Sequence, residues 1–287
     1  MANKELATDE IQMISLSELK PYEDAPFKVR DDDNMKELVQ SIKDSGILVP
    51  LIARPHPKGG YELLAGHRRA KASEQNNLEK VPVIVKDFDD DTAIILLVDS
   101  NLHREDILPS EKARAYEMKM EALSNQGKRN DLTSRQVGEK LSVTQISESA
   151  GDSERQVHRY IRLTYLIPGI LQMVDDGKIA LTPAVEISYL TNREQRELLE
   201  TMECEDCTPS LSQAIQLKQL SQSGNLDIYT VFDILTQRKP NQQDKISFRT
   251  DDVRKFFPKS YTTAQMQDVI LRLLEGYQRQ RQRSQER

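Results

Sequence analysis

The pattern of apolar and polar positions divides the chain into a mixed N-terminal part and a helical remainder. Short apolar runs predict strands at residues 11–16, 47–53, 61–65 and 81–85. Between them, helical stripes begin at Asn34, after Gly66 and at Thr92. The first helix is expected to start at Asn34, with Glu37 at the capping-box position, and to end at Gly46. The N-terminal part is therefore expected to be a small mixed α/β domain.

Helical periodicity dominates from Pro109 onward, and this proline suits the first turn of a helix. Residues 239–245 are polar, contain a proline and read as a linker. An amphipathic stripe follows at helical spacing and is a candidate dimer seam or a helix packed on its own domain: Met266, Val269, Ile270, Leu273, Leu274 and Tyr277. The predicted class is α+β, with domains at 1–107 and 108–238 and a C-terminal helical segment at 246–287.

Composition favours a soluble, mostly helical protein, because 37% of residues are hydrophobic, 30% are charged and Trp is absent. Cys204 and Cys207 cannot form a disulfide framework, and they lack the second ligand pair that a structural zinc site needs. We read them as two ordinary thiols. No apolar run approaches the roughly 20 residues that span a bilayer, and the N-terminus lacks a signal-peptide core. The expected location is cytoplasmic, with no membrane contact.

The net charge of −6 argues against a general nucleic-acid coat, because phosphate binding depends on Lys and Arg. A protein that reads DNA with one face remains compatible with this charge. Basic residues do gather in three places, at 67–71, at 155–162 and at 279–283. Each cluster is either a solvated face or a binding site, so its local structural context must decide.

The strongest local signal is a helix-turn-helix pattern at about residues 144–163. Gly151 supplies a tight turn, Ser153 is placed to cap a second helix, and a Gln stands three residues further on. Val157 and Ile161 lie four residues apart and are expected to pack inward. The polar side chains around them are the candidate DNA contacts: Ser153, Arg155, Gln156, His158, Arg159 and Arg162.

A recognition helix places its N-terminal end against base edges, where Arg pairs with guanine and Gln pairs with adenine. Arg162 lies further along the helix and is expected at a phosphate. The alternative is an ordinary helical hairpin with a polar outer face. The coincidence of the turn glycine, the cap and three arginines favours DNA binding.

Two further segments suggest anion chemistry. At Gly66 a predicted strand turns into a helix whose first residues are His67, Arg68 and Arg69. Exposed amides, the helix dipole and two guanidinium groups favour a phosphate there, although a basic surface turn is the alternative. In residues 99–109, Asn101 and Glu105 are candidate ligands for a hydrated Mg²⁺ beside a nucleotide. The alternative there is a polar helix end with an ion pair of Arg104.

Together these segments resemble the ParB family of partition proteins. The order matches: a Gly-x-Arg-Arg turn, an Asn-x-x-Arg-Glu-Asp segment, a helix led by proline, and then a helix-turn-helix. The resemblance covers roughly residues 8–190 and includes residues 26–30 and 46–50. The combination is far more specific than any one of its motifs.

The resemblance implies a ParB-like, sulfiredoxin-like N-terminal domain that binds CTP with Mg²⁺ and closes a DNA-loaded homodimer into a sliding clamp. It also implies a palindromic, centromere-like site in double-stranded DNA, a ParA-type ATPase as partner, and association with the nucleoid or a plasmid. By position, the nucleotide would be bound by Gly66, His67, Arg68, Arg69, Asn101, Arg104 and Glu105, with Asn101 and Glu105 nearest the metal.

Three positions depart from the family pattern. His67 and Ser100 replace carboxylates, and Val49 replaces a glutamine. The family links these positions to nucleotide hydrolysis, and carboxylates position water or metal in such reactions. We therefore expect slow CTP hydrolysis or none, and assign no catalytic residue. The pattern also resembles ParB-like proteins of plasmids and other mobile elements.

Two alternatives stay open at this stage. Within the family, the chain would instead be a nucleoid-occlusion factor or a transcription regulator. In a different class, it would be an ATP- or CTP-dependent enzyme with the ParB fold, such as a small-molecule kinase or a sulfiredoxin-like protein. Gly66 stands where sulfiredoxin has its reactive cysteine, while Glu105 or Asp106 is available as a kinase carboxylate. The helix-turn-helix argues against both enzymes.

Overall fold

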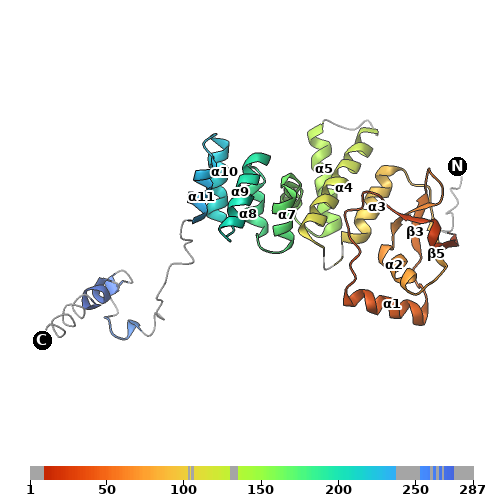
Figure 1. The fold of residues 1–287 in the computed structure, drawn as a ribbon, viewed down its shortest axis with the longest axis horizontal. Helices are drawn as coiled ribbons and strands as arrows, with labels where there is room; N and C mark the ends of the chain where they lie inside the picture. Colours follow the sequence, from red (N-terminus) through yellow and green to blue (C-terminus); the bar gives the residue numbers. More distant parts are fainter. Residues whose placement is uncertain are drawn as a thin grey trace. The chain divides into compact units, whose positions relative to one another are not determined.

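The computed structural model describes residues 10–102, 104, 107–129, 135–236, 253–258, 261–262, 265–266 and 268–274. Contacts divide the chain into two compact units, Met1–Gln237 and Arg238–Arg287. In the first unit, strands and three helices precede a series of further helices, coloured from red through green to cyan in Figure 1. This arrangement confirms the predicted α+β class.

The N-terminal sheet has five strands in the order β1-β5-β3-β4-β2. β1 pairs antiparallel with β5, and β3 with β4, whereas the β3–β5 and β2–β4 pairs are parallel. Apolar side chains of these strands, including Leu51, Leu63 and Val83, form one buried core. The strands are β1 (Ile11–Ser15), β2 (Leu19–Pro21), β3 (Leu51–Pro55), β4 (Tyr61–Ala65) and β5 (Lys80–Val85), with a short 3₁₀ turn η1 (Leu16–Glu18).

Three helices accompany the sheet: α1 (Asp33–Ser45), α2 (His67–Gln75) and α3 (Asp90–Leu102). Helices α1 and α2 share a small apolar core that contains Met35 and Ala72. The predicted start of α1 at Asn34 is wrong, because Asp32 is its N-cap and accepts a hydrogen bond from Met35 N at 2.8 Å. Capping at Asp32 places Met35 in the first turn, where it is buried.

The strand predicted at residues 47–53 begins later, at Leu51. Residues 46–50 instead form a loop that ends at Pro50, which has no amide hydrogen for a sheet ladder. The strand at 61–65 has the predicted bounds, because the Gly59–Gly60 turn before it and Gly66 after it define both ends. Gly46 ends α1 as predicted.

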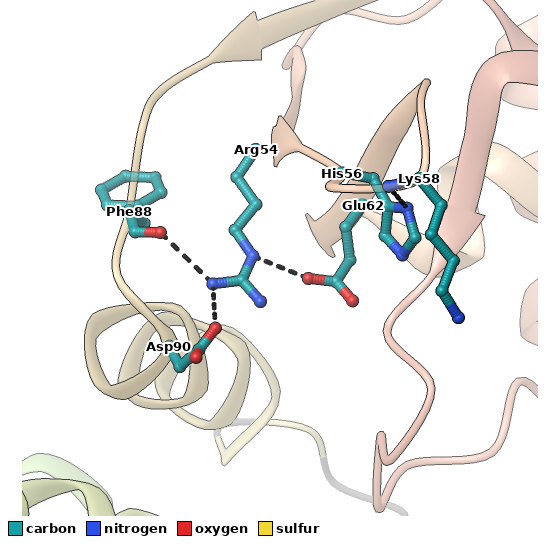
Figure 2. A network of polar contacts seen from close by, with 6 residues as sticks. All are labelled: Arg54, His56, Lys58, Glu62, Phe88 and Asp90. Carbon is teal, nitrogen blue, oxygen red and sulfur yellow. Dashed lines mark hydrogen bonds and ion pairs between the residues drawn. The ribbon is translucent and has the colours of Figure 1, made fainter.

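An ion network connects the start of α3 to the sheet (Figure 2). Arg54 of β3 pairs with Glu62 of β4 and with Asp90 of α3, each at 2.7 Å, and donates to the Phe88 carbonyl at 3.2 Å. In the adjacent turn, Lys58 N donates to His56 Nδ1 at 3.1 Å. The network attaches the first turn of α3 to β3, so it helps to fix the position of this helix relative to the sheet.

The helices after the sheet bury two apolar cores. The first joins α3, α4, α5 and α6, and contains Val98, Tyr116, Ile146 and Val157. The second lies among α7 to α11 and contains Ile170. The elements are α4 (Pro109–Arg129), α5 (Arg135–Ala150), α6 (Glu154–Arg162), η2 (Leu163–Tyr165), α7 (Pro168–Asp175), α8 (Leu181–Ile187), α9 (Asn192–Cys204), α10 (Leu211–Gln222) and α11 (Ile228–Thr236).

In the second unit, residues 265–266 and 268–274 are helical and include most of the predicted amphipathic stripe. Met266 is buried, whereas Leu271, Leu273 and Leu274 are exposed. The predicted linker at 239–245, Tyr277 and the basic residues at 279–283 lie outside the described residues. None of the helices described here is long and apolar enough to cross a membrane.

Candidate DNA-binding and nucleotide-binding sites

Helices α5 and α6 form the predicted helix-turn-helix, although α5 is longer than the short helix expected before Gly151. Gly151 lies in the turn with φ +72°. Ser153 caps α6, and its hydroxyl accepts from Gln156 N at 3.2 Å. Val157 is fully buried and Ile161 packs against the same core, so the inward side of α6 is the one predicted.

The turn between α5 and α6 is held by α4. The Asp152 carboxylate accepts a hydrogen bond from the Tyr116 hydroxyl at 2.6 Å and pairs with Lys112 Nζ at 2.7 Å. The same lysine nitrogen lies 4.8 Å from the ring centre of Tyr160 on α6. Burial and then the Asp152 carboxylate raise the pKa of Tyr116 well above its ordinary value, so the phenol stays protonated as a donor.

The outward side of α6 carries most of the predicted DNA contacts. Arg155 and His158 are exposed, and Arg155 lies in the first helical turn. Gln156 and Arg159 are half-buried and bonded to each other, with Arg159 Nη1 donating to Gln156 Oε1 at 3.2 Å. Arg159 also donates to the Thr182 hydroxyl of α8. This side therefore offers one exposed guanidinium and one that is tethered.

Arg162 lies differently from the phosphate contact that we expected. Its Nε and Nη2 donate to the Ser188 hydroxyl and carbonyl at 3.0 and 2.8 Å, respectively. Its guanidinium carbon lies 4.2 Å from the ring centre of Tyr165 and 4.1 Å from that of Tyr189. Arg162 thus has several partners within its own chain.

Gly66 forms the junction between β4 and α2, with φ +101° in the left-handed region. A Cβ placed there would lie 2.9 Å from Leu51 Cγ and 3.2 Å from Arg69 Nη2. Both the backbone and the packing therefore require glycine. Because Gly66 has no side chain, Arg69, the third residue of α2, can fold back across the turn.

Three guanidinium groups meet beside this turn. Arg68 pairs with Asp32 at 3.0 Å, and Arg30 pairs with Glu111 of α4 at 3.8 Å. Burial lowers the pKa of Arg104, and the nearby Arg68 lowers it further, while Glu111 opposes that effect. We call Arg30, Arg68 and Arg104 the arginine cluster. Its like charges repel one another, so it suits an anion.

His67 lies next to the arginine cluster and is half-buried. Burial lowers the pKa of His67, a hydrogen bond with the Leu63 backbone opposes this, and Arg104 lowers it further. The imidazole is therefore neutral at neutral pH. Within the described residues, two buried nitrogens have no hydrogen-bond partner in this region, His67 Nε2 and Arg30 Nη2.

The remaining predicted nucleotide contacts differ in their partners. Arg69 donates from Nη1 to the Val49 carbonyl and, at 2.8 Å, to the Pro50 carbonyl, so it holds the loop before β3. The Asn101 amide nitrogen donates to the Leu97 carbonyl at 2.8 Å. Glu105, the other predicted metal ligand, lies outside the described residues.

The predictions from sequence missed three members of this site: Arg30, Asp32 and Glu111. The carboxylate of Glu111 is buried and accepts from Lys28 N at 3.0 Å and from Leu108 N at 3.2 Å. The one available signal was the position of Arg30 within the family-like residues 26–30. Nothing in the sequence indicated that an acid on α4 would face it.

Comparison with protein families identifies the N-terminal part. Residues 1–102 match the ParB N-terminal domain. The chain is 28% identical to a probable chromosome-partitioning protein ParB of Vibrio cholerae over 87% of this chain and 85% of that protein. It is 33% identical to the chromosome-partitioning protein Spo0J of Thermus thermophilus over 65% of this chain and 64% of that protein.

The relative from Bacillus subtilis, stage 0 sporulation protein J, is 30% identical over 68% of this chain and 63% of its own length. The chain thus spans less than two thirds of the Thermus and Bacillus relatives. A structure of Caulobacter crescentus ParB with the centromeric parS site aligns over 79% of this chain and 100% of that one, at 20% identity and a TM-score of 0.43.

The mixed sheet, the Gly66 turn and the helix-turn-helix therefore occur in a protein with a ParB N-terminal domain. Residues 1–102 are therefore a ParB N-terminal domain, and the chain is similar to chromosome-partitioning proteins of the ParB family over most of its length.

Proposed function

We propose that this chain is a sequence-specific DNA-binding protein that acts in DNA partition. It recognises a site in duplex DNA with α6. One observation carries the proposal: Arg155 is exposed in the first turn of a helix that Ser153 caps and Val157 buries on its inner side. Such a turn approaches base edges in the major groove, where a guanidinium pairs with guanine. The partition relatives of Vibrio and Thermus support this reading.

The protein acts as a homodimer on a palindromic site. The described part of the C-terminal helix exposes Leu271, Leu273 and Leu274. Exposed leucines along one helix lose contact with water when a second copy packs against them. Two joined copies would present two α6 helices to half-sites spaced by about one helical turn or a multiple of it.

The arginine cluster binds the triphosphate of a nucleotide, and the resemblance to ParB implies that this nucleotide is CTP. An anion would give Arg30 Nη2 and His67 Nε2 the hydrogen bond that they lack, and the start of α2, which has no side-chain cap, follows Gly66 directly. The residues present therefore fit such a group. Arg68 and Arg104 contact phosphate oxygens, and Arg69 supports them through the loop before β3.

Mg²⁺ would neutralise charge on the triphosphate. Asn101, through its amide oxygen, and Glu105 are the residues that would approach it. No group of three or more metal-ligating side chains occurs in the described ranges, so the nucleotide would supply most ligands. With His67 and Ser100 in place of carboxylates, the chain hydrolyses CTP slowly or not at all.

The bound nucleotide gates the DNA clamp, and the protein acts in the cytoplasm at a nucleoid or plasmid with a ParA-type ATPase. Immunoprecipitation and sequencing of bound DNA, with and without CTP, tests this proposal. We expect a few palindromic sites clustered near one operon or replication origin, and spreading from them only with CTP. Dispersed sites would favour nucleoid occlusion or transcription regulation within the same family.

The role of α6 has a direct test. Arg155→Ala should abolish enrichment at these sites while the fold is retained. Unchanged sequence preference in this variant would overturn the proposal that α6 reads DNA.

A further inference from the structure

The C-terminal end of α6 is joined to α8 and α10 by alternating cations and rings. The guanidinium of Arg162 contacts the rings of Tyr165 and Tyr189, and Lys218 Nζ lies 3.8 Å from the centre of the Tyr189 ring. We call Arg162, Tyr165, Tyr189 and Lys218 the Arg162 clamp. Arg162 lies in α6, Tyr165 in η2 and Lys218 in α10, and Tyr189 follows the end of α8.

Hydrogen bonds hold both cations of the clamp in place. Ser188, which is 2% exposed, accepts from Arg162 through its hydroxyl and its carbonyl. The Ser188 hydroxyl in turn donates to the Val185 carbonyl at 2.7 Å. Lys218 pairs with Glu186 of α8 at 2.8 Å, with about a quarter of each side chain exposed. Both cations of the clamp therefore have fixed partners within the chain, while the rings of Tyr165 and Tyr189 stay partly exposed.

We propose that Arg162 is a positioning residue, which sets the angle of α6 through this clamp and does not contact DNA phosphates. The inference rests on the proposed reading of DNA by α6. It assigns to the Arg162 clamp a part in sequence discrimination, because α6 has nine residues and small rotations about its end move Arg155 relative to base edges. The planar guanidinium is suited to this role, since it stacks on rings and donates in a fixed fork.

A phosphate contact and a positioning role make different predictions for salt dependence. A lost phosphate contact weakens binding to all sequences and reduces the slope of log affinity against log salt by about 1. A misplaced recognition helix keeps its charges but loses base contacts, so the preference for the correct sequence falls while the slope is kept.

The experiment uses the full chain and the duplex that it enriches from a randomised DNA pool, with a scrambled duplex as reference. Arg162→Lys keeps the charge but removes the fork and the stacking. Tyr189→Leu removes a ring without changing charge. We expect both variants to lower the ratio of specific to scrambled affinity by roughly tenfold, with the salt slope unchanged. The double variant should lose little more than either single one.

Arg155→Ala is the matched control at the DNA-facing end of the same helix, and it should lower affinity and sequence preference whatever Arg162 does. If Arg162→Lys and Tyr189→Leu keep the sequence preference, or if Arg162→Ala reduces the salt slope by about 1, Arg162 is not a positioning residue. If Arg155→Ala has no effect, the proposed function itself fails. If Arg162→Ala does not fold, Tyr165→Leu is measured in its place. This substitution removes an exposed ring of the clamp, and an unchanged sequence preference would again exclude the positioning role.

Discussion

At the scale of single residues, Gly66 is under two constraints that Gly59 shares only in part. Both have positive φ, but only Gly66 has side-chain atoms where a Cβ would stand. Gly59→Ala should therefore cost about 1 kcal/mol of unfolding free energy from backbone strain, and Gly66→Ala about 2–3 kcal/mol. Urea denaturation measures both.

The same pair of variants tests the nucleotide site. Gly66→Ala displaces Arg69 and the first turn of α2, so it should weaken CTP binding in calorimetry, whereas Gly59→Ala should not. Equal effects of the two variants would show that close packing at Gly66 is unimportant.

His67 makes stability depend on pH. Because burial lowers its pKa in the folded protein, the unfolded chain takes up a proton first, at about pH 6.5. Stability is therefore complete above that pH and falls as the pH drops toward the folded pKa. His67→Gln should flatten this part of the curve, as measured by urea denaturation between about pH 7.5 and 5.5. An unchanged curve in the variant would exclude His67 as its source.

At the scale of helices, the caps of α6 and α9 form a matched pair. Ser153 caps α6, and Thr191 caps α9 with a full capping box. Replacement of either residue by Ala should cost about 1 kcal/mol of stability. Only Ser153→Ala frays the turn that carries Arg155, so only this variant should weaken specific DNA binding in a titration. Comparable DNA affinities for the two variants would contradict the role given to this turn.

Much of the element pattern followed from local signals. Tyr61–Ala65 has the predicted bounds because glycines flank it, and α4 begins at Pro109 as expected. The cap of α1 is Asp32 and not Asn34. Several acidic residues before Asn34 are equally suitable caps, and only the burial of Met35 in the first turn distinguishes Asp32 from them. Local chemistry thus locates elements more reliably than it fixes their first residue.

The candidate sites were harder to predict, because they depend on contacts between distant residues. Arg30 pairs with Glu111, which lies 81 residues further along the chain. Arg162 faces Ser188 instead of solvent because α8 lies beside α6, a placement that helical periodicity alone does not reveal. The motif residues were visible in the sequence, whereas the partners that give each one its role were not.

At the scale of the whole molecule, the exposed leucines of the C-terminal helix predict that the protein is a dimer. Leu273→Asp combined with Leu274→Asp should convert a dimer into a monomer, because a charge in an apolar seam is left without a partner. Arg272→Ala on the same helix, at a side chain that is 77% exposed, should leave the dimer intact. Sedimentation velocity distinguishes these outcomes, and a monomeric parent protein would refute the seam.

The first turn of α4 has a practical consequence for recombining ParB proteins. Its consecutive residues Glu111 and Lys112 face the arginine cluster and the Asp152 turn, respectively. A chimaera joined at residue 107 would take the arginines from one parent and the residue at position 111 from another, so Arg30 would lose its partner wherever that residue is not an acid. Grafts meant to exchange DNA specificity should therefore keep α4 with its own N-terminal domain and carry over a basic residue at 112 for the incoming turn.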